Sequence, residues 1–148
     1  MSASHLVSLA FAGGMLGGCG VLSEPDPPLS QLRAAPTSLV VDDRVVPVGA
    51  EIWRNLMPSI GHRGSPLTVF LHLPGNAPAL TVTRLWVLLG DQVWSGPAER
   101  DQGTTTWVAR NGPEWPVGAS TEVVGRIRLD SQRSVLVRVP GVVIGGAY

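Results

Sequence analysis

The stretch EVVGRIRLDSQRSVLVRV, residues 122–139, decides the fold class. Apolar and polar side chains alternate along both of its arms, which is the period of a β-strand with one buried face. The side chains expected on the buried faces are Val123, Ile127, Leu129, Val135, Val137 and Val139. The stretch therefore predicts a β-hairpin with a short turn at its centre.

The register of this hairpin follows from its charges. The turn must hold an odd number of residues, because a one-residue slip would turn one apolar face toward solvent. A turn at Ser131–Arg133 would set Arg126 directly opposite Arg138, and like charges in that position are destabilising. A turn at Asp130–Gln132 avoids this contact, so we predict the second register.

The same kind of pattern runs through the chain from Leu39 onward. Asp42-Asp43 and Gly90-Asp91 separate short apolar runs, as two-residue hairpin turns do, and the second turn would pair Leu88 with Val93 and Val87 with Trp94. The other expected strands cover residues 39–41, 44–48, 51–56, 67–73, 80–89 and 104–110.

These features predict an all-β protein with one folded domain, residues 39–148. The chain has 18 glycines and 13 prolines in 148 residues, which fits many short strands joined by turns. A single antiparallel β-sandwich that resembles the immunoglobulin or fibronectin type III architecture is the expected packing, with Trp53 or Trp86 as the core tryptophan. A closed barrel is the competing architecture.

The first residues have the pattern of an export signal. Leu6–Gly18 is apolar and uncharged, too short to span a bilayer, and is followed by Cys19, the only cysteine. The run Leu16-Gly17-Gly18-Cys19 resembles the lipobox of bacterial lipoprotein precursors. The resemblance implies a signal peptide over residues 1–18, cleavage before Cys19 and attachment of membrane lipid to Cys19. The segment Met1–His5 departs from the pattern, since it carries no lysine or arginine.

The lipoprotein resemblance also implies a cell-envelope location. Gly20, rather than an aspartate, follows the cysteine, which in a diderm implies the outer membrane, facing the periplasm or the surface. Residues 19–38 contain Glu24-Pro25-Asp26-Pro27-Pro28 and Ala34-Ala35-Pro36, so we expect a Pro-rich tether between the lipid and the domain.

Composition and motifs exclude several function classes. The formal net charge is zero, which gives no basis for binding nucleic acid. No P-loop is present, and the segment Gly61–Pro66 lacks the G-x-S-x-G pattern of a hydrolase elbow. We therefore expect no enzyme activity and no cofactor. The leading hypothesis is a non-enzymatic binding or assembly module for an envelope protein or polymer.

Two surface features are candidate contact sites. Arg126, Arg128 and Arg138 share the polar face of the final hairpin and could bind carboxylates or phosphates. Trp115 lies in the loop between Asn111 and Pro116, where it either tucks into the end of the domain or anchors a partner.

Two alternatives remain open. Met57, His62 and His72 could bind copper, since thioether and imidazole suit that metal. A carboxylate-based hydrolase could use Glu99, Asp101 and Glu114, although all three lie in expected turns.

Overall fold

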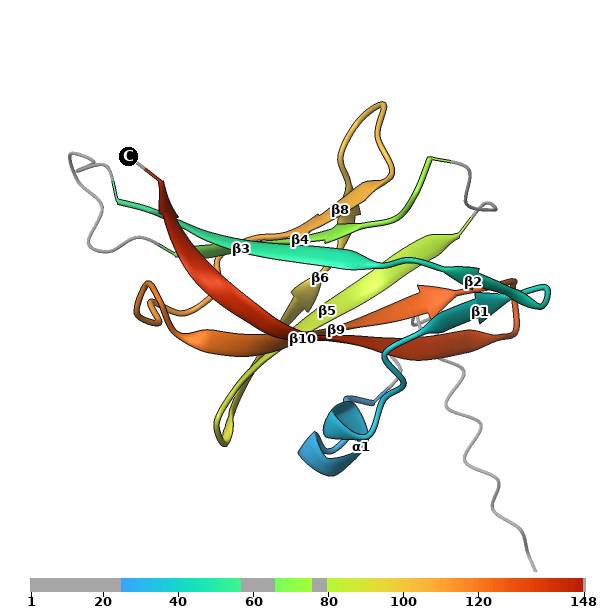
Figure 1. Ribbon diagram of the computed structural model, residues 1–148, viewed down its shortest axis with the longest axis horizontal. Coiled ribbons are helices and arrows are strands. Elements are labelled where there is room, and N and C mark those ends of the chain that lie inside the picture. Colours follow the sequence, from blue (N-terminus) through green and yellow to red (C-terminus); the bar gives the residue numbers. More distant parts are fainter. Residues whose placement is uncertain (1–24, 57–65, 76–79, 148) are drawn as a thin grey trace, which may run out of the picture.

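Strands make up most of the computed structural model, which describes residues 25–56, 66–75 and 80–147 (Figure 1). The elements are α1 (Leu29–Arg33), β1 (Leu39–Val41), β2 (Arg44–Val46), β3 (Gly49–Asn55), β4 (Leu67–His72), β5 (Thr81–Leu89), β6 (Gln92–Pro97), β7 (Glu99–Arg100), β8 (Thr106–Ala109), β9 (Ser120–Arg128) and β10 (Ser134–Ala147). The all-β class is confirmed. Within these residues, no helix is long and apolar enough to cross a membrane.

One large sheet holds eight of these strands, in the order β6-β5-β9-β10-β3-β4-β8-β7, and β1 with β2 forms a separate ribbon. The long strand β10 joins the two halves of the sheet. It runs antiparallel to β9 as far as Val143, and its last four residues, from Ile144, run parallel to β3. The expectation of a purely antiparallel sheet is therefore wrong at this junction. Pro140-Gly141 interrupts the pairing with β9, and Gly141 has a φ of 67°, so β10 bends there and continues past the predicted end of the hairpin.

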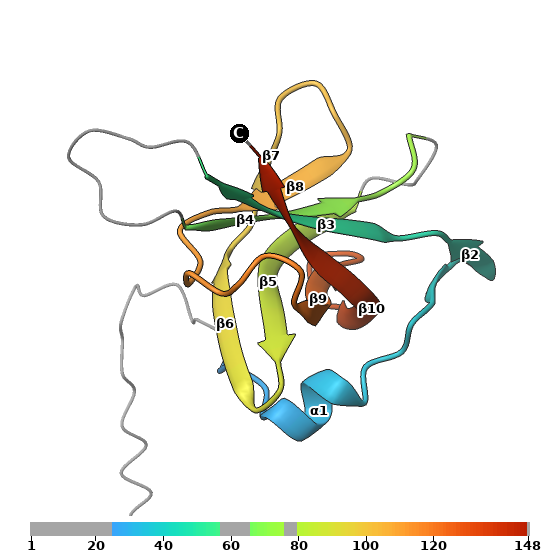
Figure 2. The same cartoon turned by 60° about the vertical axis from the view of Figure 1, so that its left-hand side comes forward.

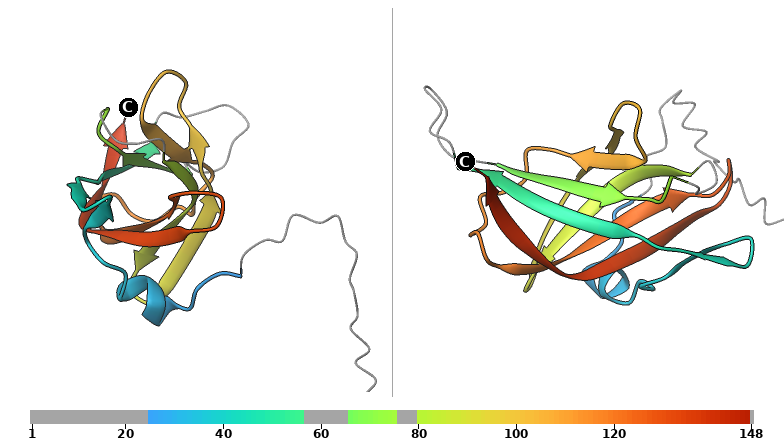
Figure 3. Two further views of the ribbon diagram at one scale, coloured as in Figure 1. Left: turned by 90° about the vertical axis from the view of Figure 1, so that its right-hand side faces the viewer. Right: turned by 45° about the horizontal axis from the view of Figure 1, so that its top comes forward.

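The sheet curls until its two edges meet. The edge strands β6 and β7 are consecutive in the chain and are separated by Ala98 alone. The amide of Ala98 donates a hydrogen bond of 3.2 Å to the carbonyl of Thr83 on β5. The arrangement is accordingly barrel-like, and its end-on view is in Figure 3, left.

The interior of this curled sheet is the main core. On β4 the buried residues Leu67, Val69 and Leu71 alternate with half-exposed ones, as the sequence predicts. Gly125 on β9 also points inward, because a Cβ on it would lie 2.9 Å from Leu71 Cδ2. Other members of the core include Ile52, Val82, Leu85, Val87, Val123, Ile127, Val137 and Ile144.

The predicted register of the last hairpin is confirmed. Arg126 lies opposite Leu136, and Arg138 lies opposite Val124, so the two arginines are not direct partners. The turn is closed by a 2.9 Å hydrogen bond from the Leu129 amide to the carbonyl of Arg133.

Both two-residue turns are confirmed as well. Leu88 pairs with Val93 and Val87 with Trp94, around a Gly90 whose φ is 57°. Asp42 and Asp43 connect β1 to β2 with φ values of 50° and 61°. Positive φ at both central residues is the geometry that a type I′ hairpin turn requires.

The segment from Leu29 to Pro36 belongs to the folded unit. Leu32 of α1 is 1% exposed and packs with Ala35 on the outer face of β5, β9 and β10 against Trp86, Leu88 and Val124. The Arg33 side chain donates a hydrogen bond to the Gly90 carbonyl, and the Arg138 amide donates one of 2.8 Å to Pro36. Residues 29–36 of the expected tether, residues 19–38, therefore pack on the sheet and are not a free spacer. Residues 19–24 of that tether lie outside the described residues.

Candidate binding face

An open groove of about 420 Å³ lies on the outer face of β3, β4 and β8. Successive side chains of a β-strand point to opposite faces of the sheet. On β4, Thr68, Phe70 and His72 therefore point outward into the groove, while their neighbours fill the core. The full lining is Glu51, Trp53, Asn55, Thr68, Phe70, His72, Asp101, Thr106, Arg110 and Ala147. The groove thus has an aromatic floor and polar rims on both sides.

Trp53 is the most exposed aromatic side chain of this face, at 40%. It pairs in register with Gly145 of β10, and a Cβ built on Gly145 would lie 2.8 Å from the indole Cζ3. The ring therefore lies directly over the glycine backbone. Glycine at this position permits the close packing, and the indole is supported on one side and open to solvent on the other.

A second groove, of about 460 Å³, adjoins the first on the other side of Trp53. It runs between β3 and the bend of β10, and Glu51 and Trp53 line both grooves. Its remaining lining includes Pro140, Gly141, Val143 and Gly145, of which Val143 is 56% exposed. Together the two grooves form a track with Trp53 in the middle.

His72 is held in a fixed position on this face. Its Nε2 lies 3.4 Å from Glu51 Oε2, and its Nδ1 lies 2.9 Å from the hydroxyl of Thr106. The ring is parallel to Phe70, with a centroid separation of 6.3 Å and an interplanar angle of 1°. These contacts come from three neighbouring strands, so they also fix the shape of the groove floor.

The charged side chains of the first groove carry a small negative balance. Glu51 and Asp101 are carboxylates on opposite sides, and Arg110 is the one cation among the described lining residues apart from any charge on His72. Asn55, Thr68 and Thr106 add neutral hydrogen-bonding groups. This balance disfavours an anionic ligand, and the neutral groups suit a ligand with many hydrogen-bonding groups.

The three predicted arginines lie on one face of the last hairpin, as expected, but they do not form a free basic patch. Arg138 forms an ion pair of 2.6 Å with Glu122, both about a quarter exposed at 22% and 25%. Arg126 lies with its Cζ 5.0 Å from the ring centroid of Trp86, a cation–π contact. Arg128 is exposed. The structure thus uses two of the three predicted arginines in intramolecular contacts.

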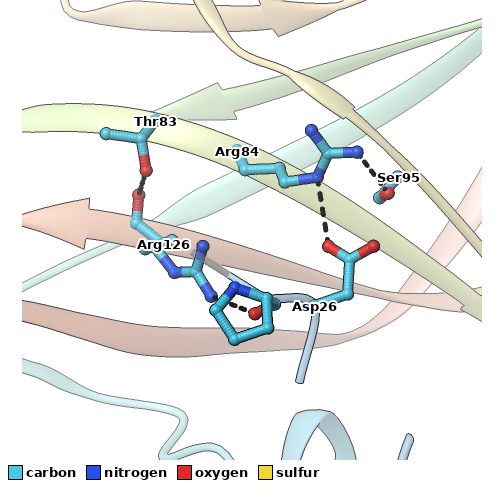
Figure 4. Close-up of polar contacts among 6 residues, drawn as sticks. Asp26, Thr83, Arg84, Ser95 and Arg126 are labelled. Atoms are coloured by element: carbon cyan, nitrogen blue, oxygen red, sulfur yellow. Dashed lines mark hydrogen bonds and ion pairs between the residues drawn. The ribbon is translucent and has the colours of Figure 1, made fainter. Parts of the chain in front are cut away.

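Arg126 also lies directly opposite Arg84 of β5, a like-charge pair that the sequence did not reveal. Figure 4 shows how the pair is compensated: Arg84 Nε lies 3.4 Å from Asp26, and Arg84 donates a 2.8 Å hydrogen bond to Ser95. Arg126 donates a 3.5 Å hydrogen bond to the carbonyl of Pro25. The two arginines therefore hold the start of the described chain against the sheet.

Trp115 is partly buried and packs against the main core. Its carbonyl accepts a 3.0 Å hydrogen bond from Arg54 Nη1. This is the tucked arrangement of the two that the sequence left open, and it gives the loop from 111 to 116 a structural role.

The residues of the alternative hypotheses do not converge in the described part of the chain. Met57 and His62 lie outside the described residues, as does the lipobox with Cys19. Within the described ranges there is no group of three or more His, Cys, Asp or Glu that could hold a metal ion. Of Glu99, Asp101 and Glu114, Asp101 alone lines the first groove.

The importance of Trp53 was missed from the sequence, although a signal for it was present. Ala50 and Ile52 face the core, so the alternation along β3 places Glu51, Trp53 and Asn55 outside. The prediction that Trp53 or Trp86 is the core tryptophan is wrong for both residues. Trp53 is exposed, and Trp86 is buried under α1 on the outer face of the sheet.

The comparisons with known proteins found no relative of this chain. No protein-family model matches the chain, and neither a curated protein nor a solved structure matches it significantly. The function must therefore be inferred from the residues of this face and from the N-terminal motif.

Proposed function

We propose that this protein is a lipid-anchored lipoprotein of the cell envelope that presents a non-enzymatic binding module, with its ligand site in the two grooves beside Trp53. Support for the anchor is the sequence Leu16-Gly17-Gly18-Cys19 after an apolar segment. An acylated cysteine with two or three chains binds a membrane far more firmly than a single chain does. Membrane lipid is accordingly one partner, and the second is an envelope polymer or protein in the grooves.

The observation that carries the binding site is the exposed indole of Trp53 between two grooves. A tryptophan with 40% of its surface in water loses the stabilisation that burial would provide. Packing over Gly145 holds the ring in place without covering it. A rigid, exposed aromatic surrounded by polar side chains is the usual centre of a binding surface.

The placement of the N-terminal segment supports presentation of this site away from a membrane. Pro25 and Asp26 are held at Arg126 and Arg84, on the α1 side of the sheet, and β3, β4 and β8 lie on the opposite side (Figure 2). Cys19 precedes Pro25 by six residues, a length of chain that spans at most about 20 Å. An anchor at Cys19 would therefore keep the α1 side toward the lipid and the grooves toward the surroundings.

A binding role also fits the openness of the site better than catalysis does. Catalytic sites generally exclude water around the reacting atoms. Glu51 and His72, which would be the natural acid and base here, are 56% and 40% exposed and are paired with each other. We therefore assign them to ligand recognition.

The test separates the anchor from the site with two variants of the full-length chain in a bacterium that acylates lipoproteins. Cys19→Ala is expected to leave the membrane fraction, while Trp53→Ala is expected to stay in it. A photo-crosslinking amino acid in place of Thr68, on the groove floor, should capture an envelope component in the parent and much less of it with Trp53→Ala. Membrane association without Cys19, or capture that is unchanged by Trp53→Ala, would contradict the proposal.

A further inference from the structure

We infer that the track beside Trp53 binds a neutral glycan of β1,4-linked, gluco-configured pyranoses. This inference rests on the proposed binding function and names the ligand class for the same site. The two grooves meet at Trp53 and Glu51, so a ligand that fills both must be longer than a single ring. An extended polymer strand meets this requirement.

The aromatic side chains select the shape of the ligand. The indole of Trp53 and the ring of Phe70 lie on the same face of adjacent strands, and Trp53 is 40% exposed. A pyranose with equatorial substituents has axial C–H groups on both faces, which pack on an aromatic ring without leaving a hydroxyl unpaired. Exposed Val143 extends the apolar surface in the second groove.

The polar side chains select for hydroxyl groups. A sugar hydroxyl both donates and accepts, and the first groove offers carboxylate acceptors, a guanidinium donor and neutral amide and hydroxyl groups. The two carboxylates Glu51 and Asp101 outweigh the one guanidinium of Arg110. An anionic ligand, such as a uronate polymer or a phosphate headgroup, would be repelled by this balance.

The backbone argues against a peptide strand in the first groove. One common way for a peptide to bind a sheet is to add a strand to a free edge. Under the first groove β3 is paired with β4 and, from Ile52 to Asn55, with β10, and β4 is also paired with β8. The backbone groups under this groove are therefore engaged, and recognition there must come from the side chains.

The test uses the full-length chain in detergent with two neutral hexasaccharides, cellohexaose and the hexamer of N-acetylglucosamine, and hexagalacturonate as the charged comparison. Binding is followed by tryptophan fluorescence and by calorimetry. We expect at least one neutral hexamer to bind, and we expect Trp53→Ala to weaken that binding by about tenfold or more. Trp53→Phe should lose less, because it keeps an aromatic ring.

The matched control is Val93→Ala, since Val93 on β6 is 43% exposed and lines neither groove. It should bind like the parent. Equal or tighter binding of hexagalacturonate, or equal losses in Val93→Ala and Trp53→Ala, would overturn the glycan assignment. If no hexamer binds while the crosslinker at position 68 captures an envelope protein, the ligand class is wrong and the binding module stands. If neither a glycan nor a crosslinked species is found, both proposals fall.

Discussion

The indole of Trp53 lies on the backbone of Gly145, its partner across the single parallel pairing that the described strands make. The contact is close enough that a Cβ at position 145 would lie within 2.8 Å and 2.9 Å of two ring carbons. Cβ atoms in proteins almost never come that close to a non-bonded atom, so the ring can occupy this position only because residue 145 is a glycine. The parallel end of β10 thereby builds the centre of the candidate binding face.

Gly145→Ala should displace the Trp53 ring with little loss of stability. Since the ring is partly exposed, it can move aside, and we expect the free energy of unfolding to fall by less than about 1 kcal/mol. Tryptophan fluorescence and hexasaccharide affinity should both change in the direction of Trp53→Ala. Unchanged affinity in a folded Gly145→Ala variant would show that the position of the ring does not matter for binding.

Leu32→Ala should destabilise the whole domain. Leu32 is 1% exposed and packs against Trp86 and Val124, so its truncation should cost about 2–4 kcal/mol of unfolding free energy in a denaturant titration. Gln31→Ala, at an exposed position of the same helix, is the control and should change stability by less than about 0.5 kcal/mol. Similar small effects of the two changes would mean that α1 is part of a loose tether after all.

Arg138→Ala should destabilise the protein by about 1–3 kcal/mol, because it leaves the partly buried Glu122 without its 2.6 Å partner. It also removes the 3.3 Å hydrogen bond to the Ala35 carbonyl. Arg128→Ala, on the exposed end of the same face, should be nearly neutral. Thermal denaturation of both variants measures these effects. Equal losses of stability in Arg138→Ala and Arg128→Ala would contradict a stabilising role for the Arg138–Glu122 ion pair.

The turn of the last hairpin should carry a pH-dependent part of the stability. Hydrogen bonds from the backbone amide of Gln132 and from the side chain of Arg133 lower the pKa of Asp130 below its ordinary value. The ionised carboxylate therefore stabilises the folded state above the ordinary pKa, and this stabilisation is lost as the pH falls through the folded pKa.

We accordingly expect Asp130→Asn to lower the melting temperature at pH 7 and to have little effect near about pH 2. Ser131→Ala, at an exposed neighbour in the turn, should show no such change with pH. NMR titration of the Asp130 carboxyl measures the pKa directly. A value at or above the ordinary one, or an effect of Asp130→Asn that does not depend on pH, would refute this assignment.

Local patterns were sufficient to predict the hairpin registers and most of the strands, although not β7 or the part of β10 after Val139. Alternation along residues 122–139 and the avoidance of an Arg126–Arg138 pair gave the correct register, because both are properties of neighbouring strands. The position of Arg84 opposite Arg126 was not predicted, since β5 and β9, which carry the two residues, are far apart in the sequence.

Long-range features could not be read in this way. The bend at Pro140-Gly141 sends β10 to β3, and the passage through Ala98 brings the edges of the sheet together. Neither has a periodic signature. The candidate site depends on the first of these features, because Trp53 needs Gly145 beneath it, and the sequence alone did not place those two residues side by side.

The most direct test of the anchored binding module is intact mass spectrometry of the full-length protein extracted from membranes, beside Cys19→Ala. We expect a chain that begins at Cys19 and carries the added mass of a diacylglyceryl group, with or without a further acyl chain, and no such species for the variant. An unmodified chain with Met1 still in place, recovered from the soluble fraction, would contradict it.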